Sequence, residues 1–273
     1  MSSTQDRPPP LEPVEPAAPL APWLGGKRLL AKRIVERIEA VPHRCYAEPF
    51  AGMGGVFFRR TRRPSAEIIN DIDGEIVNLF RAVREHPDEL QRQFGSVLAA
   101  RQEFERQLAV PPETLTDIQR AARFLYLQRL RFAGRPDARS MGFRREGLPD
   151  FRVAMIRRLV SAAHRRLQRV QIERLEWHEF IRRYDRDFTL FYLDPPYWGH
   201  ETDYGKGLFA REDFARMADL LRGLKGRFIL SLNDRAEVRE TFAGFAFEEV
   251  RTRYSVSWKA GKKTVGELLI SNG

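Results

Sequence analysis

A short apolar run that ends abruptly at a carboxylate constrains this chain more than any other stretch. Residues 189–193 have the composition of a buried strand, and Asp194-Pro195-Pro196-Tyr197 follows directly. Because Pro195 has no backbone N–H, its carbonyl and the Asp194 carboxylate form a pair of hydrogen-bond acceptors without a nearby donor. The ring of Tyr197 adds a flat apolar face. Such a strand end suits a planar ligand with an amino group, and an extruded adenine or cytosine fits it.

Asp-Pro-Pro is also a common turn sequence, and an aspartate after a strand often only caps a helix. Composition helps to separate the two interpretations. The chain has 273 residues, enough for one domain with an insertion, and its 47 Lys and Arg against 37 Asp and Glu give a formal charge of +10. This balance favours a polyanionic partner, with nucleic acid the leading candidate.

Cysteine usage and hydropathy exclude several other classes of protein. The single cysteine, Cys45, excludes an internal disulfide framework and a cysteine-rich zinc site, so we expect no metal. No apolar run is long enough to span a membrane, and no charged segment precedes an apolar one at the N-terminus. We therefore expect a cytoplasmic protein without a membrane partner.

The N-terminal region changes character at Trp23. Residues 1–22 are dominated by proline, with Ser, Glu and Ala between, and we expect a disordered tail there. Gly25-Gly26-Lys27 then precedes a segment of helical periodicity, Leu29–Ile38, and the two glycines let the backbone approach a ligand closely. This is not a P-loop, because the four-residue spacing and the hydroxyl after the lysine are missing.

A second strand followed by a glycine-rich turn lies at residues 44–58. Glycines at the carboxyl end of a strand permit close ligand approach, as in the opening unit of a nucleotide-binding α/β sheet. Glu48 precedes the turn and suits a ligand with a positive charge. The next strand, residues 67–73, ends in Asn70-Asp71-Ile72-Asp73, where such folds place the carboxylate that accepts hydrogen bonds from ribose hydroxyls.

Several motifs occur in the order found in one enzyme family. They are Trp23-Leu24-Gly25-Gly26-Lys27, Glu48-Pro49-Phe50-Ala51-Gly52-Met53-Gly54, Asn70-Asp71-Ile72-Asp73, Asp194-Pro195-Pro196-Tyr197 and Glu267-Leu268-Leu269-Ile270. From Trp23 to Asn272 the chain therefore resembles the Dam-type (D12 class) DNA adenine-N6 methyltransferases, which use S-adenosylmethionine. The resemblance implies an α/β fold in which a Rossmann-like methyltransferase sheet carries a helical target-recognition insertion. It also implies a double-stranded DNA partner and a base that is flipped out of the helix.

The resemblance divides the chain into parts with separate tasks. We expect a disordered Pro-rich tail at 1–22, the cofactor-binding half of the catalytic domain at 23–78, the target-recognition insertion at 79–168 and the catalytic half at 169–273. Asp71 is expected at the ribose, and Lys27 and Trp23 at the methionine portion of the cofactor. Glu176 and Trp177 are expected at its adenine ring, although an ordinary helix start is an equally open interpretation there. The expected cofactor-binding residues are Trp23, Gly26, Lys27, Glu48, Pro49, Phe50, Gly52, Gly54, Asp71, Ile72, Glu176 and Trp177.

The insertion has almost only helical patterning. It predicts helices at residues 76–84, 87–108, 114–132 and 152–167. Arginines are dense here, and they supply phosphate contacts and hydrogen bonds to guanine edges. The family often has Phe-Asn-Gly where this chain has Phe132-Ala133-Gly134, so the details of target recognition do not carry over. The expected DNA-binding residues are Arg129, Arg131, Arg135, Arg139, Arg144, Arg145, Lys206, Lys262 and Lys263.

The chemistry follows from the residue types at the strand end. The Asp194 carboxylate and the Pro195 carbonyl would accept the two hydrogens of an exocyclic amine and accommodate the positive charge that develops as its nitrogen attacks the methyl group. Tyr197 would stack on the flipped base. Methylation at cytosine C5 needs a cysteine nucleophile, usually after a proline, whereas Cys45 follows Arg44. The expected catalytic residues are Asp194, Pro195, Pro196 and Tyr197.

Alternatives stay open at this stage. Transfer to cytosine N4 needs the same pair of acceptors, and an RNA adenine also suits Asp-Pro-Pro-Tyr. A catalytically silent DNA-binding protein that kept the fold is the alternative from a different class. The sequence does not define the DNA site or the biological role, for which a restriction partner, a replication or repair mark and phage genome protection all fit. We expect a monomer, because no segment suggests a dimer seam.

Overall fold

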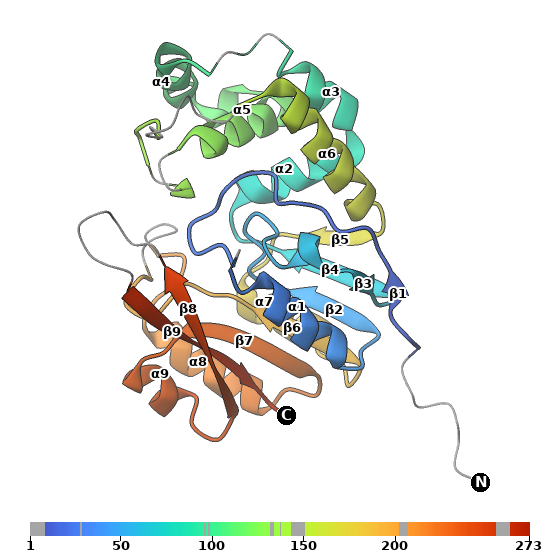
Figure 1. The fold of residues 1–273 in the computed structure, drawn as a ribbon, viewed down its shortest axis with the longest axis vertical. Coiled ribbons are helices and arrows are strands. Elements are labelled where there is room, and N and C mark those ends of the chain that lie inside the picture. Colours follow the sequence, from blue (N-terminus) through green and yellow to red (C-terminus); the bar gives the residue numbers. More distant parts are fainter. Residues whose placement is uncertain are drawn as a thin grey trace.

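Within the part of the chain that the computed structural model describes, seven strands form one mixed sheet (Figure 1). The described residues are 9–27, 29–95, 97, 99–131, 134–136, 138–142, 151–201, 207–254 and 263–273. Across the sheet the strands are β5 (Val170–Glu173), β4 (Ala66–Asn70), β2 (Cys45–Glu48), β6 (Thr189–Leu193), β7 (Arg227–Asn233), β9 (Lys263–Ser271) and β8 (Ala246–Tyr254). The predicted Rossmann-like methyltransferase sheet is confirmed.

The sheet grows in opposite directions from the boundary between β2 and β6. On one side β2 pairs with β4 and β4 with β5, and on the other β2 pairs with β6 and β6 with β7, all in parallel. β9 runs antiparallel to both of its neighbours, β7 and β8. In sheets of this kind, ligands bind outside the carboxyl ends of the strands at the point where the strand order reverses.

Helices cover both faces of the sheet. Alternate side chains of β6 point to opposite faces, and each face packs into its own hydrophobic cluster. Leu190 and Tyr192 pack in one cluster with residues of α1, whereas Phe191 and Leu193 pack in the other with residues of α7, α8 and α9. Every residue of β6 is buried, which explains its unbroken apolar run. These helices are α1 (Ala31–Ala40), α7 (Trp177–Tyr184), α8 (Glu212–Arg222) and α9 (Ala236–Thr241).

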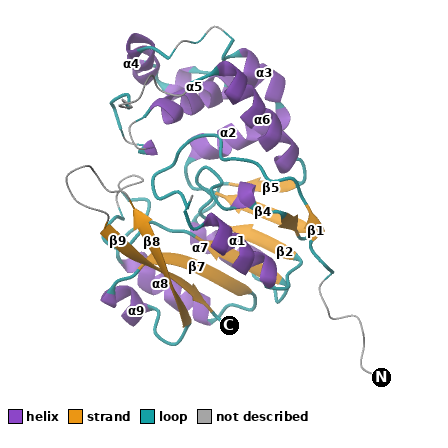
Figure 2. Ribbon diagram, in the orientation of Figure 1, coloured by secondary structure: helices purple, strands orange, loops and turns teal. Residues whose placement is uncertain are grey.

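A helical region lies at one end of the molecule, beyond the β5 edge of the sheet (Figure 2). It is formed by α2 (Gly74–Glu85), α3 (Pro87–Arg92), α4 (Arg101–Ala109), α5 (Asp117–Leu130) and α6 (Val153–Leu167). A 3₁₀ turn at Pro112–Thr114 lies between α4 and α5, and another at Phe57–Arg59 follows β2. Thr116 begins α5 with a capping box to Gln119. Among the described residues, no helix combines the length and the apolar composition that a membrane crossing requires.

The prediction of one helix from residue 87 to residue 108 is wrong. α3 ends at Arg92, and Gly95 closes a turn by donating from its N–H to the Arg92 carbonyl at 3.0 Å. Phe94 turns inward at this break, is 1% exposed and packs edge-on against Phe151 at 5.9 Å between ring centroids. The burial of this aromatic ring accounts for the break, and the periodicity of the sequence did not reveal it.

The prediction of a disordered tail through residue 22 does not hold for residues 9–22. Glu12–Pro13 forms β1, which pairs antiparallel with β3 (Arg62–Arg63). Val14 donates from its N–H to the Thr61 carbonyl at 2.8 Å, and the apolar side chain of Leu20 is fully buried. A Pro-rich segment lacks the periodicity of an element, yet here it gains backbone partners and a hydrophobic surface to cover. The further division at residues 78 and 168 stays a prediction.

Candidate active site

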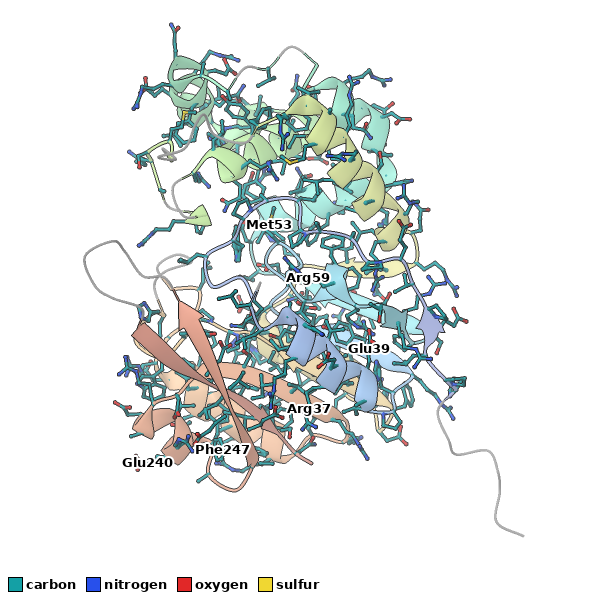
Figure 3. All side chains as sticks on the ribbon, in the orientation of Figure 1. Arg37, Glu39, Met53, Arg59, Glu240 and Phe247 are labelled. Carbon is teal, nitrogen blue, oxygen red and sulfur yellow. The ribbon has the colours of Figure 1, made fainter. Side chains whose placement is uncertain are left out.

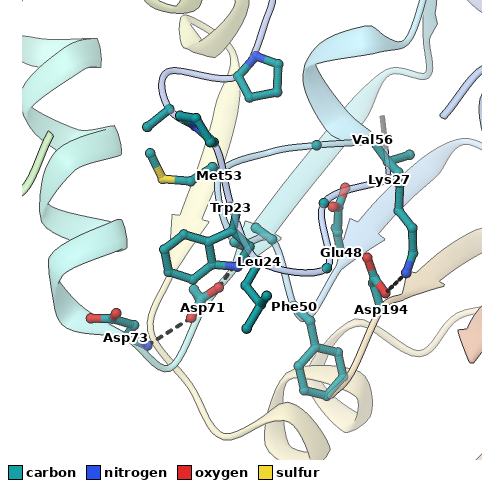
Figure 4. A pocket seen from close by; sticks show the side chains of 18 of the residues that line it. Trp23, Leu24, Lys27, Glu48, Phe50, Met53, Val56, Asp71, Asp73 and Asp194 are labelled. Atoms are coloured by element: carbon teal, nitrogen blue, oxygen red, sulfur yellow. Dashed lines mark hydrogen bonds and ion pairs between the residues drawn. The ribbon is translucent and has the colours of Figure 1, made fainter. Parts of the chain in front are cut away.

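A cavity of about 430 Å³ opens at the carboxyl ends of β2, β4 and β6, where the strand order reverses (Figure 4). Asp194 and Lys27 lie on one side of it, Asp71 and Asp73 on the other, and Trp23 between them. Met53 and Arg59, which also line it, lie between the helical region and α1 (Figure 3). The predicted catalytic and cofactor-binding residues that line this cavity are Trp23, Gly26, Lys27, Glu48, Phe50, Gly52, Asp71, Ile72, Asp194 and Pro196.

Lys27 is the centre of a buried cluster of charges. Its side chain is 1% exposed, and Nζ lies 2.8 Å from Asp194 Oδ1 and 3.0 Å from Glu267 Oε1. It also donates to the Tyr197 hydroxyl at 2.5 Å. Burial acts to lower the pKa of Lys27, but the surrounding carboxylates and tyrosines outweigh it and hold this pKa well above its ordinary value. The lysine therefore stays charged over the whole working pH range.

Two carboxyl groups at this side of the cavity bind protons more tightly than usual. Burial raises the pKa of Asp194 to about 6, against the opposing effect of Lys27. Burial likewise raises the pKa of Glu48 to about 8, although the Tyr46 hydroxyl donates to Glu48 Oε2 at 2.7 Å and acts in the other direction. A nearby positive charge would lower the pKa of both carboxyl groups and favour their ionised forms.

Asp71 joins the end of β4 to the glycine-rich turn after β2. Its Oδ2 accepts the N–H of Gly52 at 2.8 Å, and its Oδ1 accepts the N–H of Asp73 at 2.9 Å. Gly52 has φ of +50°, and a Cβ there would lie 2.8 Å from the Trp23 indole nitrogen, so only glycine fits this position. Burial raises the pKa of Asp71 to about 7. The carboxylate thus shapes the turn as well as facing the cavity.

Two buried asparagines hold the strand ends around the cavity, and the sequence interpretation gave neither of them a role. Asn70 donates to the carbonyls of Pro49 and Leu175, both at 3.0 Å, and so connects the ends of β2, β4 and β5. Asn233, at the end of β7, bonds both the N–H and the carbonyl of Trp198 at 3.0 Å. It thereby fixes the loop that follows Asp194. Polar residues at strand ends were the only signal in the sequence.

Some predicted site residues lie away from the cavity wall. Tyr197 is bonded to Lys27, whose Nζ lies 4.3 Å from the centroid of its ring, and neither Tyr197 nor Pro195 lines the cavity. Trp177 is buried and packs against Phe209 at 6.4 Å, so that Phe209 forms the wall on this side. Three further predicted residues do not line the cavity, namely Pro49, Gly54 and the exposed Glu176.

The N-terminal segment supplies part of the cavity wall that the sequence did not predict. Ala18, Pro19, Ala21 and Pro22 line the cavity on the side of α5. Gln128 of α5 is fully buried, and its amide nitrogen donates to the carbonyls of Pro22 at 2.9 Å and Gly134 at 2.7 Å. Helix α5, expected to serve target recognition, therefore also supports the cavity.

The predicted DNA-binding residues have different surroundings. Arg129 lines the cavity and donates to the Leu20 carbonyl at 2.8 Å, and Arg131 donates to the Gln128 side chain at 3.4 Å. Arg135 is half-buried and Arg139 is exposed. Outside the described residues lie Arg144, Arg145, Lys206 and Lys262, together with the side chain of Lys263. A contact with DNA stays a prediction for all nine. In the described part of the chain, no group of three or more His, Cys, Asp or Glu side chains could hold a metal ion.

A cavity at the reversal point of a Rossmann-like sheet, with an Asp-Pro-Pro strand end beside it, is typical of a methyltransferase that acts on an amino group. The family then follows from comparison with known proteins. Residues 23–256 match the family of D12 class N6 adenine-specific DNA methyltransferases, and the chain belongs to this family. It is therefore a site-specific adenine DNA methyltransferase, as the motifs predicted.

Full-length relatives agree with the family match. The Type II methyltransferase M.CviBI of Paramecium bursaria Chlorella virus NC1A is 23% identical over 248 residues, which are 89% of this chain and 94% of that protein. The Type II methyltransferase M1.LlaDCHI of Lactococcus lactis subsp. cremoris is 26% identical over 278 residues, covering 93% of this chain and 95% of that protein. A solved precorrin 8W decarboxylase of Methanobacterium thermoautotrophicum covers 90% of this chain and 89% of its own at 12% identity and a TM-score of 0.37, too distant to carry an argument.

Proposed function

We propose that this chain transfers the methyl group of S-adenosylmethionine to N6 of an adenine flipped out of double-stranded DNA. The observation that carries this proposal is the position of Asp194, at the carboxyl end of β6 and at the wall of the cavity. A cofactor in the cavity and an amine held by Asp194 would then meet at one strand end. The proposal includes Pro195 as the second acceptor and Tyr197 as the stacking residue.

The side chains around the cavity fit this cofactor. A volume of about 430 Å³ suits a nucleoside joined to an amino acid. Phe50 and Ile72 offer apolar surface for its base, and Asp71 offers oxygen atoms for ribose hydroxyls. Glu48, which burial leaves with a pKa of about 8, favours a ligand of positive charge. When bound, the sulfonium supplies an activated methyl group.

The residues of this chain would prepare the target amine. The amine of adenine is a weak nucleophile because its lone pair is delocalised into the ring. The Asp194 carboxylate would accept a hydrogen bond from one N–H of the amine and the Pro195 carbonyl from the other, so that positive charge on the nitrogen develops beside a carboxylate. Lys27 engages Oδ1 of Asp194 at 2.8 Å and leaves the other oxygen for the amine.

The direct test is transfer of a labelled methyl group from S-adenosylmethionine to unmethylated plasmid DNA, followed by nucleoside analysis. N6-methyladenine is the expected product, and sequencing of the methylated DNA then defines the site. N4-methylcytosine would overturn the assignment of the base. Methylation of RNA alone would overturn the assignment of the substrate. Sedimentation of the active protein tests the further proposal that it acts as a monomer.

A further inference from the structure

Glu267 is a buried carboxylate to which the proposed mechanism gives no task. It lies in β9 and pairs with Asn233 of β7, next to the loop that carries the active-site motif. It is 2% exposed, and its Oε1 lies 3.0 Å from Lys27 Nζ and accepts the Ser231 hydroxyl at 2.5 Å. Its second oxygen, Oε2, is buried without a hydrogen-bond partner among the described residues.

Glu267 completes the surroundings of Lys27. An ammonium group has three N–H donors, and Lys27 directs them at Tyr197, Asp194 and Glu267. With one partner for each donor, the position of Nζ is determined, and so is the oxygen of Asp194 that it engages. Loss of Glu267 would free one donor and let the ammonium move toward Asp194.

Glu267 also changes the balance of charge at the site. Lys27 carries one positive charge, and two carboxylates share it. The groups that face Asp194 from the packed elements are Lys27, Glu267, Tyr192, Tyr197 and Glu48. With Glu267 ionised, the three charged groups in direct contact sum to one negative charge. Without it they sum to zero, and Asp194 becomes a weaker acceptor.

We propose that Glu267 is a positioning residue for methyl transfer, which holds Lys27 and keeps the cluster around Asp194 negatively charged where the target amine becomes positive. The inference rests on the proposed function of Asp194. A buried lysine could also be neutralised by Asp194 alone, so a second carboxylate at 3.0 Å is not needed for that purpose. Because burying an additional carboxylate is costly, this placement points to a requirement of the reaction.

The test compares Glu267→Gln, which keeps the shape and the acceptor for Ser231, with the wild type. We expect the single-turnover rate at neutral pH to fall on the order of 10-fold or more. The acidic limb of the pH–rate profile, near 6 in the wild type if Asp194 must be ionised, should move to lower pH because Lys27 then acts on Asp194 without opposition. Glu267→Asp, with its carboxylate withdrawn by one methylene, should show a smaller change in the same direction.

Glu248→Gln is the matched control. Glu248 lies on the neighbouring strand β8 and pairs with Arg33 and Arg37, so the same substitution removes ion pairs away from Asp194. A second readout needs no activity, since the carboxyl ¹³C signal of Asp194, assigned by its loss in Asp194→Asn, reports its pKa directly. In a Lys27→Met background, the added Glu267→Gln substitution should lower the rate less than it does in the wild type, because only its effect on the charge around Asp194 remains.

Each outcome has a defined meaning. A lower rate with an unchanged Asp194 titration would show a merely structural role and overturn the proposal, as would an unchanged rate in both Glu267 variants. Additive losses in the Lys27→Met background would show that Glu267 does not act through Lys27. Failure of the wild type to methylate DNA would overturn the proposed function instead, and the ¹³C titration would still decide whether Glu267 controls Asp194.

Discussion

The Asp194 carboxylate is partly buried beside one lysine, and its side chain is 20% exposed. Burial raises its pKa to about 6, while Lys27 at 2.8 Å keeps it from rising further. At neutral pH the group is therefore mostly ionised and only partly hydrated, a state in which a carboxylate acceptor interacts strongly with a developing positive charge. The same balance makes the residue sensitive to a change of a single atom.

Replacing Asp194 by Asn should remove most of the methyl transfer. The amide keeps the shape but presents an NH2 donor where an acceptor is needed, so we expect the single-turnover rate to fall about 100-fold or more. Affinity for S-adenosylhomocysteine, measured by calorimetry, should change little. Asp187→Asn is the matched control, because Asp187 is exposed at the opposite end of β6. A rate close to that of the wild type would rule out Asp194 as the acceptor.

Glu48 should make cofactor binding depend on pH. With a pKa of about 8 in the free protein, Glu48 is largely protonated at pH 7, and a positively charged ligand favours its ionised form. Binding should therefore release protons at pH 7 and strengthen as the pH rises toward 8. Calorimetry in two buffers of different ionisation enthalpy measures this release. Glu48→Gln should remove the component near pH 8 and leave that of Asp71, whose pKa is about 7. Binding without proton release would contradict the role of Glu48.

Residues of the site could be predicted where one short motif contains the chemistry. Asp194 and Asp71 each follow a strand directly, and Glu48 is the last residue of one, so the sequence placed all three at the carboxyl ends of strands. Glu267 and Asn233 come together only because β9 inserts antiparallel beside β7. Asn70 reaches Leu175 across 105 positions of sequence. No local pattern encodes such contacts, so these residues could not be assigned roles from the sequence.

At the scale of elements, the end of α5 is the support of the cavity wall. Gln128 bonds the Pro22 carbonyl, and Leu24 donates to the Gly134 carbonyl at 3.1 Å. Gly134 has φ of +69°, and a Cβ there would come within 2.9 Å of the Pro22 backbone. The close contact explains why glycine stands at this position. The segment from Pro22 to Lys27 is thus fixed by a helix that the sequence connected only with target recognition.

Replacing Gln128 by Met should weaken cofactor binding without touching the cofactor. Two carbonyls lose their buried donor, which costs on the order of 1–3 kcal/mol of the free energy of unfolding. Because the freed segment carries Trp23 and Lys27, affinity for S-adenosylhomocysteine should also fall. Urea unfolding and calorimetry measure the two effects. Gln102→Met, on the exposed face of α4, is the control for the substitution itself. Unchanged affinity in the Gln128 variant would show that the cavity wall keeps its shape without the hydrogen bonds from α5.

Elements were predictable where burial is uniform or strictly periodic. The observed strand β6 coincides with residues 189–193, and α1 and α6 lie within two residues of their expected bounds. The sequence did not predict the break between α3 and α4, because Phe94 continues the helical pattern of apolar residues. In the structure its ring packs against Phe151 instead. Tertiary packing of one aromatic side chain thus outweighed local propensity.

At the scale of the whole molecule, the N-terminal segment is part of the folded body. Residues 14–21 run first alongside the sheet and then along the cavity. Ala17 donates from its N–H to the Phe58 carbonyl at 2.7 Å. Composition predicted disorder because proline and small residues offer little to bury. The folded body supplies the missing partner, since Leu20 inserts into the same hydrophobic cluster as α1 and α5. A segment whose composition predicted a disordered tail thereby forms part of the wall of the cavity.

Two leucine substitutions test whether the N-terminal segment is part of the folded body or a disordered tail. Leu20 is fully buried whereas Leu29 is 54% exposed, so Leu20→Ala should lower the free energy of unfolding by about 2–5 kcal/mol and Leu29→Ala by much less. Because Ala18, Pro19 and Ala21 line the cavity, Leu20→Ala should also weaken S-adenosylhomocysteine binding. Urea unfolding gives the first quantity and calorimetry the second. Equal stability of the two variants would mean that the segment is an appendage, and a loss of stability without a loss of affinity would mean that it braces the fold without shaping the cavity.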